Sequence, residues 1–121
     1  MSWLLLAAAI ALEVMGTTCM KLSQGFTRLV PSILVFVFYM CSLTSLTLAL
    51  RKIDISIAYA IWAGVGTALI ALIGIVWFQE AASVQKVLSI GLIIIGVVGL
   101  NLQTPHAEVP PAANAPAPQV E

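Results

Sequence analysis

Residues 55–78 read ISIAYAIWAGVGTALIALIGIVWF, a stretch that contains no charged side chain. An α-helix needs about 20 mostly apolar residues, within a range of about 17–25, to cross the hydrocarbon core of a bilayer. Three further apolar runs occupy residues 3–20, 30–50 and 86–102. The first and the last of these are near the short end of that range. The pattern predicts an all-α integral membrane protein with four membrane-spanning helices.

The composition also favours a membrane protein. The 121-residue chain is 61% hydrophobic and 8% charged, whereas soluble domains are about 25% charged. A soluble chain of this length buries too little of its surface to hide so many apolar side chains. The formal net charge is zero, which disfavours nucleic acid as a partner. Cys19 and Cys41 are interpreted as packing residues, and neither a metal site nor a cofactor is expected.

The connections between the runs are short and polar, so consecutive helices are expected to be antiparallel neighbours. The first run has no positively charged segment before it and carries Glu13, so we interpret it as a retained helix and not as a signal peptide. Residues 1–103 are therefore predicted to form one four-helix membrane domain. Residues 104–121 contain five of the six prolines and little apolar surface to bury, which predicts a disordered Pro/Ala-rich tail.

The basic residues are almost evenly divided between the two sides of the predicted bundle. Lys21, Arg28 and Lys86 share one side, while Arg51, Lys52 and the N-terminal amine share the other. The positive-inside rule orients a membrane protein through an asymmetry of Lys and Arg between its loops. Because this asymmetry is almost absent, both orientations are compatible with the sequence. The pattern permits an antiparallel dimer of identical chains.

Glu13 lies near the middle of the first apolar run. A charged side chain at the centre of a membrane helix costs roughly 2.5–3.5 kcal/mol on translocon-derived scales, and such residues usually face a cavity or a proton route. Ala9, Gly16 and Thr17 lie one turn away and leave space beside the carboxylate. Apolar surroundings favour the protonated form, so Glu13 is predicted to bind and release a proton near neutral pH. The alternative is a protonated glutamate that only hydrogen-bonds another helix.

Tyr59 and Trp62 share one helical face with Gly66 in the third run. Aromatic side chains in the middle of a membrane helix do not belong to the usual interfacial belt. Facing a cavity, they would offer stacking and cation–π contacts to a flat or quaternary cation, and the alternative is ordinary packing. Gly64 and Gly66 predict either a bend in the helix or a place of close packing.

The second and fourth runs add weaker signals. Tyr39 and Ser42 are three residues apart and are predicted to project toward the same cavity, unless their hydroxyls bond their own backbone. Ser89 and Gly96 share a face of the fourth run, where small residues permit close helix packing in lipid, and we predict a dimer contact there. Four helices from one chain can hardly enclose a path across a bilayer, so transport requires an oligomer, of which a dimer is the simplest.

These residues lie in strings that resemble the small multidrug resistance family. The strings are EVMGTT at residues 13–18, Lys21, GFTR at 25–28, AYAIWAGVG at 58–66 and GVVGLNL at 96–102. The resemblance covers residues 3–102. It implies a multi-pass protein of the bacterial inner (plasma) membrane that works as an antiparallel homodimer and exchanges protons for cationic compounds.

The resemblance also implies roles for individual residues. Glu13 matches the family's essential glutamate, which binds either a proton or the substrate. The other matches are two pocket aromatics, two second-helix pocket positions and the fourth-helix dimer contact: Tyr59 and Trp62, Tyr39 and Ser42, and Ser89 and Gly96. Guanidinium-exporting members carry a tryptophan where this chain has Gly16, as in the quaternary-ammonium (Qac) subtype. The chain departs from the family at residues 79–82, QEAA, where many members have a glycine and a leucine.

The main hypothesis is therefore multidrug efflux by a proton-coupled antiporter whose substrates are lipophilic or quaternary ammonium cations. A guanidinium or polyamine exporter of the same family is an alternative, although polyamine-exporting relatives usually form heterodimers with opposed charge biases, which this chain lacks. Two further alternatives are a non-transporting membrane subunit of a larger complex and a channel-like cation leak. Nothing in the sequence indicates an enzyme.

Overall fold

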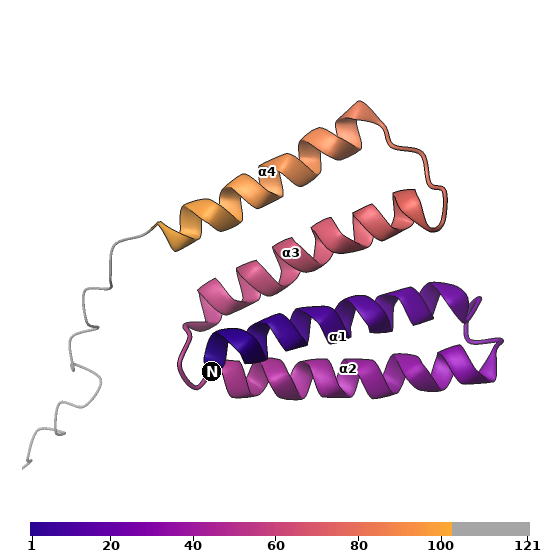
Figure 1. Cartoon of the computed structure of the whole chain (residues 1–121), viewed down its shortest axis with the longest axis horizontal. Coiled ribbons are helices and arrows are strands. Elements are labelled where there is room, and N and C mark those ends of the chain that lie inside the picture. Colours follow the sequence, from indigo (N-terminus) through magenta and orange to yellow (C-terminus); the bar gives the residue numbers. More distant parts are fainter. Residues whose placement is uncertain (103–121) are drawn as a thin grey trace, which may run out of the picture.

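A computed structural model describes residues 1–102, which form four α-helices joined by short loops (Figure 1). The helices are α1 (Ser2–Leu22), α2 (Leu29–Ala49), α3 (Ile55–Val76) and α4 (Val84–Asn101). Each of the four is long and apolar enough to cross a membrane. The predicted all-α architecture with four spans is confirmed for this part of the chain, and the predicted tail at residues 104–121 lies outside the described residues.

The helix ends differ from the predicted ones by no more than two residues, and two of the differences have clear causes. Helix α4 begins at Val84 because the Oγ of Ser83 accepts a hydrogen bond from the backbone N–H of Lys86 at 3.1 Å, which caps the first turn. Helix α3 ends at Val76 because the chain soon reaches Gln79, whose φ is 57°. This left-handed conformation does not continue a right-handed helix.

Helix α1 occupies the centre of the fold. It packs most extensively against α2 and, on its other side, against α3, while α3 also packs against α4 at the edge of the molecule (Figure 1). Consecutive helices run antiparallel, as the short loops predict, whereas the packed pair α1 and α3 runs parallel (Figure 1). The expectation that consecutive helices are also neighbours holds for α1 with α2 and for α3 with α4 but not for α2 with α3, because α3 packs on α1 instead. The buried core is drawn from α1, α2, the loop between α2 and α3, and the start of α3: Leu6, Ala9, Ile10, Val14, Leu46, Ala49, Ile53 and Ala58. No residue of α4 is buried.

The contact between α1 and α2 is close and polar as well as apolar. A Cβ atom at Gly16 would lie 2.7 Å from the ring of Tyr39, so the missing side chain lets the two helices approach. On the same interface, the buried Oγ of Ser42 donates a hydrogen bond to the backbone oxygen of Ala9 at 2.7 Å. These contacts fix α1 against α2 and turn the helix face that bears Glu13 toward α3.

Candidate functional site

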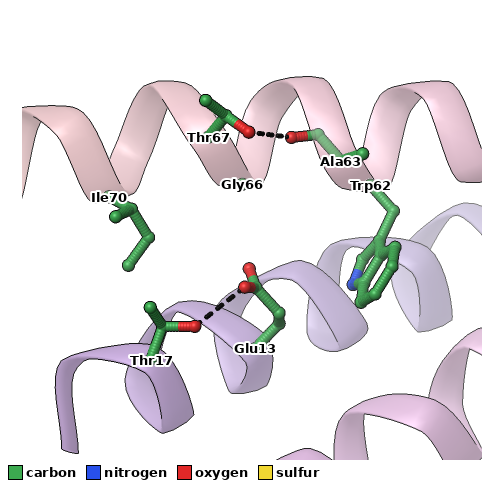
Figure 2. A pocket seen from close by; sticks show the side chains of 7 residues that line it. All are labelled: Glu13, Thr17, Trp62, Ala63, Gly66, Thr67 and Ile70. Atoms are coloured by element: carbon green, nitrogen blue, oxygen red, sulfur yellow. Dashed lines mark hydrogen bonds between the residues drawn. The ribbon is translucent and has the colours of Figure 1, made fainter. Parts of the chain in front are cut away.

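A cavity of about 280 Å³ lies between α1 and α3 (Figure 2). Its lining comes from α1 and α3 and consists of Glu13, Thr17, Trp62, Ala63, Gly66, Thr67 and Ile70. Figure 2 shows the Glu13 carboxylate extending from α1 toward α3. Glu13 is the one ionisable side chain among these lining residues, so its charge dominates an otherwise mostly apolar space.

The Glu13 carboxylate is oriented by a chain of hydroxyl groups. The Oγ1 of Thr17 donates a hydrogen bond to Glu13 Oε1 at 2.9 Å, and the same Oγ1 lies 2.6 Å from the Oη of Tyr39. A threonine hydroxyl has one hydrogen to donate. Since that hydrogen goes to Glu13, the Tyr39 hydroxyl donates to Thr17 in this arrangement. The chain links the carboxylate on α1 to the neighbouring helix α2.

The second carboxylate oxygen faces α3 at Gly66. A Cβ atom built at this buried glycine would lie 2.8 Å from Glu13 Oε2, which is closer than real Cβ atoms come to other atoms. Glycine at this position therefore creates the space that the carboxylate occupies. The sequence predicted a bend or close packing here, and the structure shows close approach of a side chain from α1 to the backbone of α3.

Trp62 forms one wall of the cavity beside Glu13 (Figure 2). Its Nε1 is buried and has no hydrogen-bond partner within residues 1–102. A buried N–H group without a partner costs about 1–3 kcal/mol, so Trp62 carries an uncompensated polar group in the wall of the cavity. Tyr59 lies one turn away, with its ring centroid 5.4 Å from that of Trp62 and an angle of 56° between the planes.

The remaining predicted pocket residues lie around the cavity but do not line it within one chain. Tyr59 is 58% exposed, and its ring packs against the ring of Trp62. Tyr39 reaches the site through Thr17, and Ser42 is committed to the backbone of Ala9 inside the α1–α2 interface. The structure thus brings four predicted residues into one cavity: Glu13, Thr17, Trp62 and Gly66.

Gly64 belongs to a different contact. It is buried, and a Cβ atom there would collide with a side-chain methyl group of Val97 and lie 3.3 Å from one of Ile93, both on α4. Helix α3 continues without interruption through Gly64 and Gly66. Of the two predicted alternatives for the glycines, close packing is seen at both positions.

The two positions predicted to form a dimer contact lie on the exposed surface of α4. A Cβ atom at Gly96 would meet nothing within 4 Å in the single chain. Ser89 is exposed, and its Oγ donates to the backbone oxygen of Gln85 in the same helix at 2.8 Å. Both positions are therefore open to another molecule, and the dimer contact stays a prediction.

Three lining residues did not emerge from the sequence: Ala63, Thr67 and Ile70. Ile70 continues the spacing of four residues that joins Trp62 to Gly66, so extending that helical face by one turn would have found it. Thr67 was available as a polar residue within an apolar run, although its Oγ1 donates to the backbone oxygen of Ala63 at 2.7 Å. Its hydroxyl is thus already used.

The arrangement is suited to binding a proton or a cation at one place. The carboxylate has one oxygen held by Thr17 and a second oxygen facing the cavity, and an aromatic ring stands beside it. Among residues 1–102, no group of three or more His, Cys, Asp or Glu side chains is placed to hold a metal ion.

Comparisons with known proteins agree with this architecture. A family model described as "Small Multidrug Resistance protein" matches residues 1–93. The chain is 58% identical over 102 residues to "Uncharacterized membrane protein YvaE" of Bacillus subtilis (strain 168), and the match covers 84% of this chain and 86% of that protein. It is 48% identical over 105 residues to "Multidrug resistance protein EbrB" of the same organism, covering 87% and 90%. It is 41% identical over 104 residues to "Guanidinium exporter" of Citrobacter freundii, covering 86% and 99%.

Proposed function

Because this chain belongs to the small multidrug resistance family of membrane transporters, we propose that it is a proton-coupled antiporter of the bacterial inner membrane. In this proposal it exports lipophilic or quaternary ammonium cations in exchange for protons. The observation that carries the proposal is the Glu13 carboxylate, which extends from a membrane-spanning helix into a mostly apolar cavity beside Trp62.

Exchange follows from competition for one carboxylate. Ionised Glu13 attracts a cation strongly, because the apolar surroundings screen its charge much less than water does. Protonated Glu13 has lost that charge and releases the cation. Proton and substrate therefore exclude each other, and a proton gradient drives the cation outward. A ligand shifts a conformational equilibrium only through its different affinity for the two states, and this carboxylate supplies that difference.

The cavity lining favours an organic cation over an inorganic one. A small inorganic cation needs several oxygen ligands to replace its water shell. This lining offers one carboxylate and the hydroxyl of Thr17, because the Thr67 hydroxyl is bonded to its own helix. An alkylated ammonium instead requires apolar contact and an aromatic face, which Ile70 and Trp62 provide.

The transporting unit in this proposal is an antiparallel homodimer in which two Glu13 carboxylates share one chamber. Three observations support a dimer: the cavity is walled by two helices of one chain, the surface of α4 is apolar and unburied, and the basic residues are balanced between the two sides. Movement of one copy against the other around a midplane site gives alternating access. The contact through Ser89 and Gly96 is part of the same proposal.

Substitution of Glu13 tests the exchange mechanism directly. We expect Glu13→Gln to abolish proton-driven uptake of tetrabutylammonium into inverted vesicles that contain the purified protein. Glu13→Asp is the matched control, because it keeps the charge and shortens the side chain by one methylene group, and it should retain slower exchange. Coupled transport that persists in Glu13→Gln would overturn the proposal. Flux that does not saturate, or that ignores the proton gradient, would instead indicate a leak.

Guanidinium export is a second candidate, favoured by the relative of that name at 41% identity. The packing at Gly16 bears on the choice between the two substrate classes. The Tyr39 ring fills the space beside this glycine, so a tryptophan at that position would displace the ring whose hydroxyl holds Thr17. This difference supports ammonium substrates for the present chain.

The release of protons from the protein when a cation binds shows which class of cation it accepts. Addition of tetrabutylammonium, guanidinium or spermidine to the purified protein should release protons when the cation displaces them from Glu13. We expect release with tetrabutylammonium and none in Glu13→Gln. Release with guanidinium or spermidine alone would replace the substrate assignment while leaving exchange at Glu13 intact. Release with none of the three would support a non-transporting subunit.

A further inference from the structure

A second cavity, of about 340 Å³, continues from the first along α1 and α3. The two cavities share Thr17, Thr67 and Ile70 in their walls. The second one extends to the loop of residues 77–83 between α3 and α4, where its lining includes Lys21, Phe78, Glu80 and Lys86. The shared walls define a route from the Glu13 carboxylate to one end of the helices.

The loop at that end folds back over α3. The backbone N–H of Glu80 donates to the backbone oxygen of Gly74 at 2.9 Å. The Glu80 carboxylate then rests on the buried Gly74, where a Cβ atom would lie 2.7 Å from its Oε2. The absence of a side chain at Gly74 therefore leaves the space that the Glu80 carboxylate of the loop occupies.

The seated carboxylate is held by a cation from α4. The Nζ of Lys86 donates to Glu80 Oε2 at 2.9 Å. This hydrogen bond and the positive charge of Lys86 lower the pKa of Glu80 from its ordinary value. Burial opposes them with a smaller effect, and the charge of Lys21 adds the smallest contribution to the lowering. Glu80 therefore stays ionised through the neutral range.

We propose that the Glu80–Lys86 ion pair is a gate that holds the 77–83 loop across the mouth of the second cavity and limits access of cations to Glu13. The inference rests on the proposed function, because the route matters to transport only if Glu13 exchanges cations. With the pair closed, the two lysines and one glutamate leave the mouth net positive, which opposes entry of a cation. An arriving ammonium group competes with Lys86 for the Glu80 carboxylate.

The strength of the pair suits a gate better than a structural brace. The side chains of Lys86 and Glu80 are 31% and 45% exposed. Ion pairs exposed to this degree contribute little to folding stability, because water screens them and long side chains lose freedom when they pair. Such a pair opens and closes readily, and removing it should leave the helices folded.

Access to the route can be measured without transport. Ile70→Cys in a Cys19→Ser, Cys41→Ser background places a single, half-buried thiol in the wall that the two cavities share. The rate at which a neutral maleimide labels this thiol in the full-length protein reports how open the route is. We expect Glu80→Gln and Lys86→Gln each to raise the rate about two- to fivefold, the range expected from loss of an exposed ion pair. The charge swap Glu80→Lys with Lys86→Glu should restore the original rate.

Two further readouts separate the gate from a general loosening of the fold. Salt screens an exposed ion pair, so higher ionic strength should speed labelling when the pair is present and have no effect in Glu80→Gln. Gly74→Ala should also speed labelling, because the added methyl group displaces the Glu80 carboxylate while the charges of Glu80 and Lys86 are kept. Arg51→Gln, at the opposite end of the helices, should change nothing.

Unchanged labelling in both Gln variants, or a charge swap that fails to restore the rate, would overturn the gate. The two proposals fail separately. Unchanged labelling together with lost exchange in Glu13→Gln would remove the gate alone, whereas exchange that persists in Glu13→Gln would remove the proposed function whatever the labelling shows.

Discussion

Helices α1 and α4 have nearly the same mean hydropathy but different surroundings. Five residues of α1 are buried, and the helix contacts both α2 and α3. No residue of α4 is buried, and the helix lies at the edge of the fold. Mean hydropathy therefore identifies both helices as spans but does not distinguish the helix that forms the site from the helix that packs only against α3.

Polar and small side chains account for the difference. Apolar residues gain little by leaving lipid for another apolar helix, so packing in a membrane depends on close approach and hydrogen bonds between helices. Helix α1 is joined to α2 through Tyr39 and Ser42. On α4, the side chains of Ser89 and Asn101 bond their own backbone. The apolar surface of α4 is thus left for lipid or for a second copy.

The largest expected effect separates a glycine in the site from one on α4. In Gly66→Ala the new Cβ would lie 2.8 Å from Glu13 Oε2, so the carboxylate must move. We expect the affinity for tetrabutylammonium to fall at least about tenfold, since small misplacements of an acting group have large effects. Gly91→Ala is the control, because a Cβ there meets nothing within 4 Å. Equal losses in both variants, measured by calorimetry, would erase the distinction between the helices that line the site and α4.

A smaller effect is expected from the hydroxyl chain that ties α1 to α2. Thr17→Val keeps the shape of the side chain but removes the hydrogen bonds to Glu13 and Tyr39. A net loss of about 1 kcal/mol corresponds to about a fivefold loss of cation affinity. Thr67→Val lines the same cavity but loses a bond within its own helix, so its affinity should stay nearly unchanged. If Thr67→Val lost more cation affinity than Thr17→Val, the hydroxyl of Thr17 would not contribute to cation binding.

The smallest expected effect tests what covers α4. The Cβ atom added in Gly96→Ala would meet no other atom of the chain within 4 Å, so folding should be unaffected. If the face with Ser89 and Gly96 forms the dimer contact, the added methyl group should weaken dimerisation about threefold, as close packing of small residues is disturbed. Sedimentation equilibrium in detergent measures this, with Gly91→Ala on another face of α4 as the control. A dimer of unchanged strength would move the contact elsewhere.

The sequence predicts the spans well because the length of an apolar run is set by the thickness of the bilayer, which is a local constraint. The end of α3 was predicted two residues too late, because it depends on one backbone conformation, the positive φ of Gln79. Gln79 opens the stretch at residues 79–82 in which the sequence departs from the family pattern that it otherwise resembles.

The candidate site was only partly predictable for a similar reason. Helical spacing places Trp62 and Gly66 on one face, and the structure turns that face toward Glu13. Spacing does not fix the rotation of one helix against another, so the commitment of Ser42 to Ala9 was not foreseen. The return of Glu80 over Gly74 depends on the loop conformation, which no periodicity encodes.

The helix lengths give the membrane itself a role in this molecule. Helix α3 has 22 residues and α4 has 18, which at 1.5 Å per residue are about 33 and 27 Å long. These lengths fall on either side of a hydrocarbon thickness of about 30 Å. A helix longer than the local thickness tilts, and a shorter one draws the bilayer inward. Thin membranes therefore tilt the helix that carries Trp62 and Gly66, whereas thick membranes act on the outer helix, and lipid composition becomes a mechanical influence on the cavity.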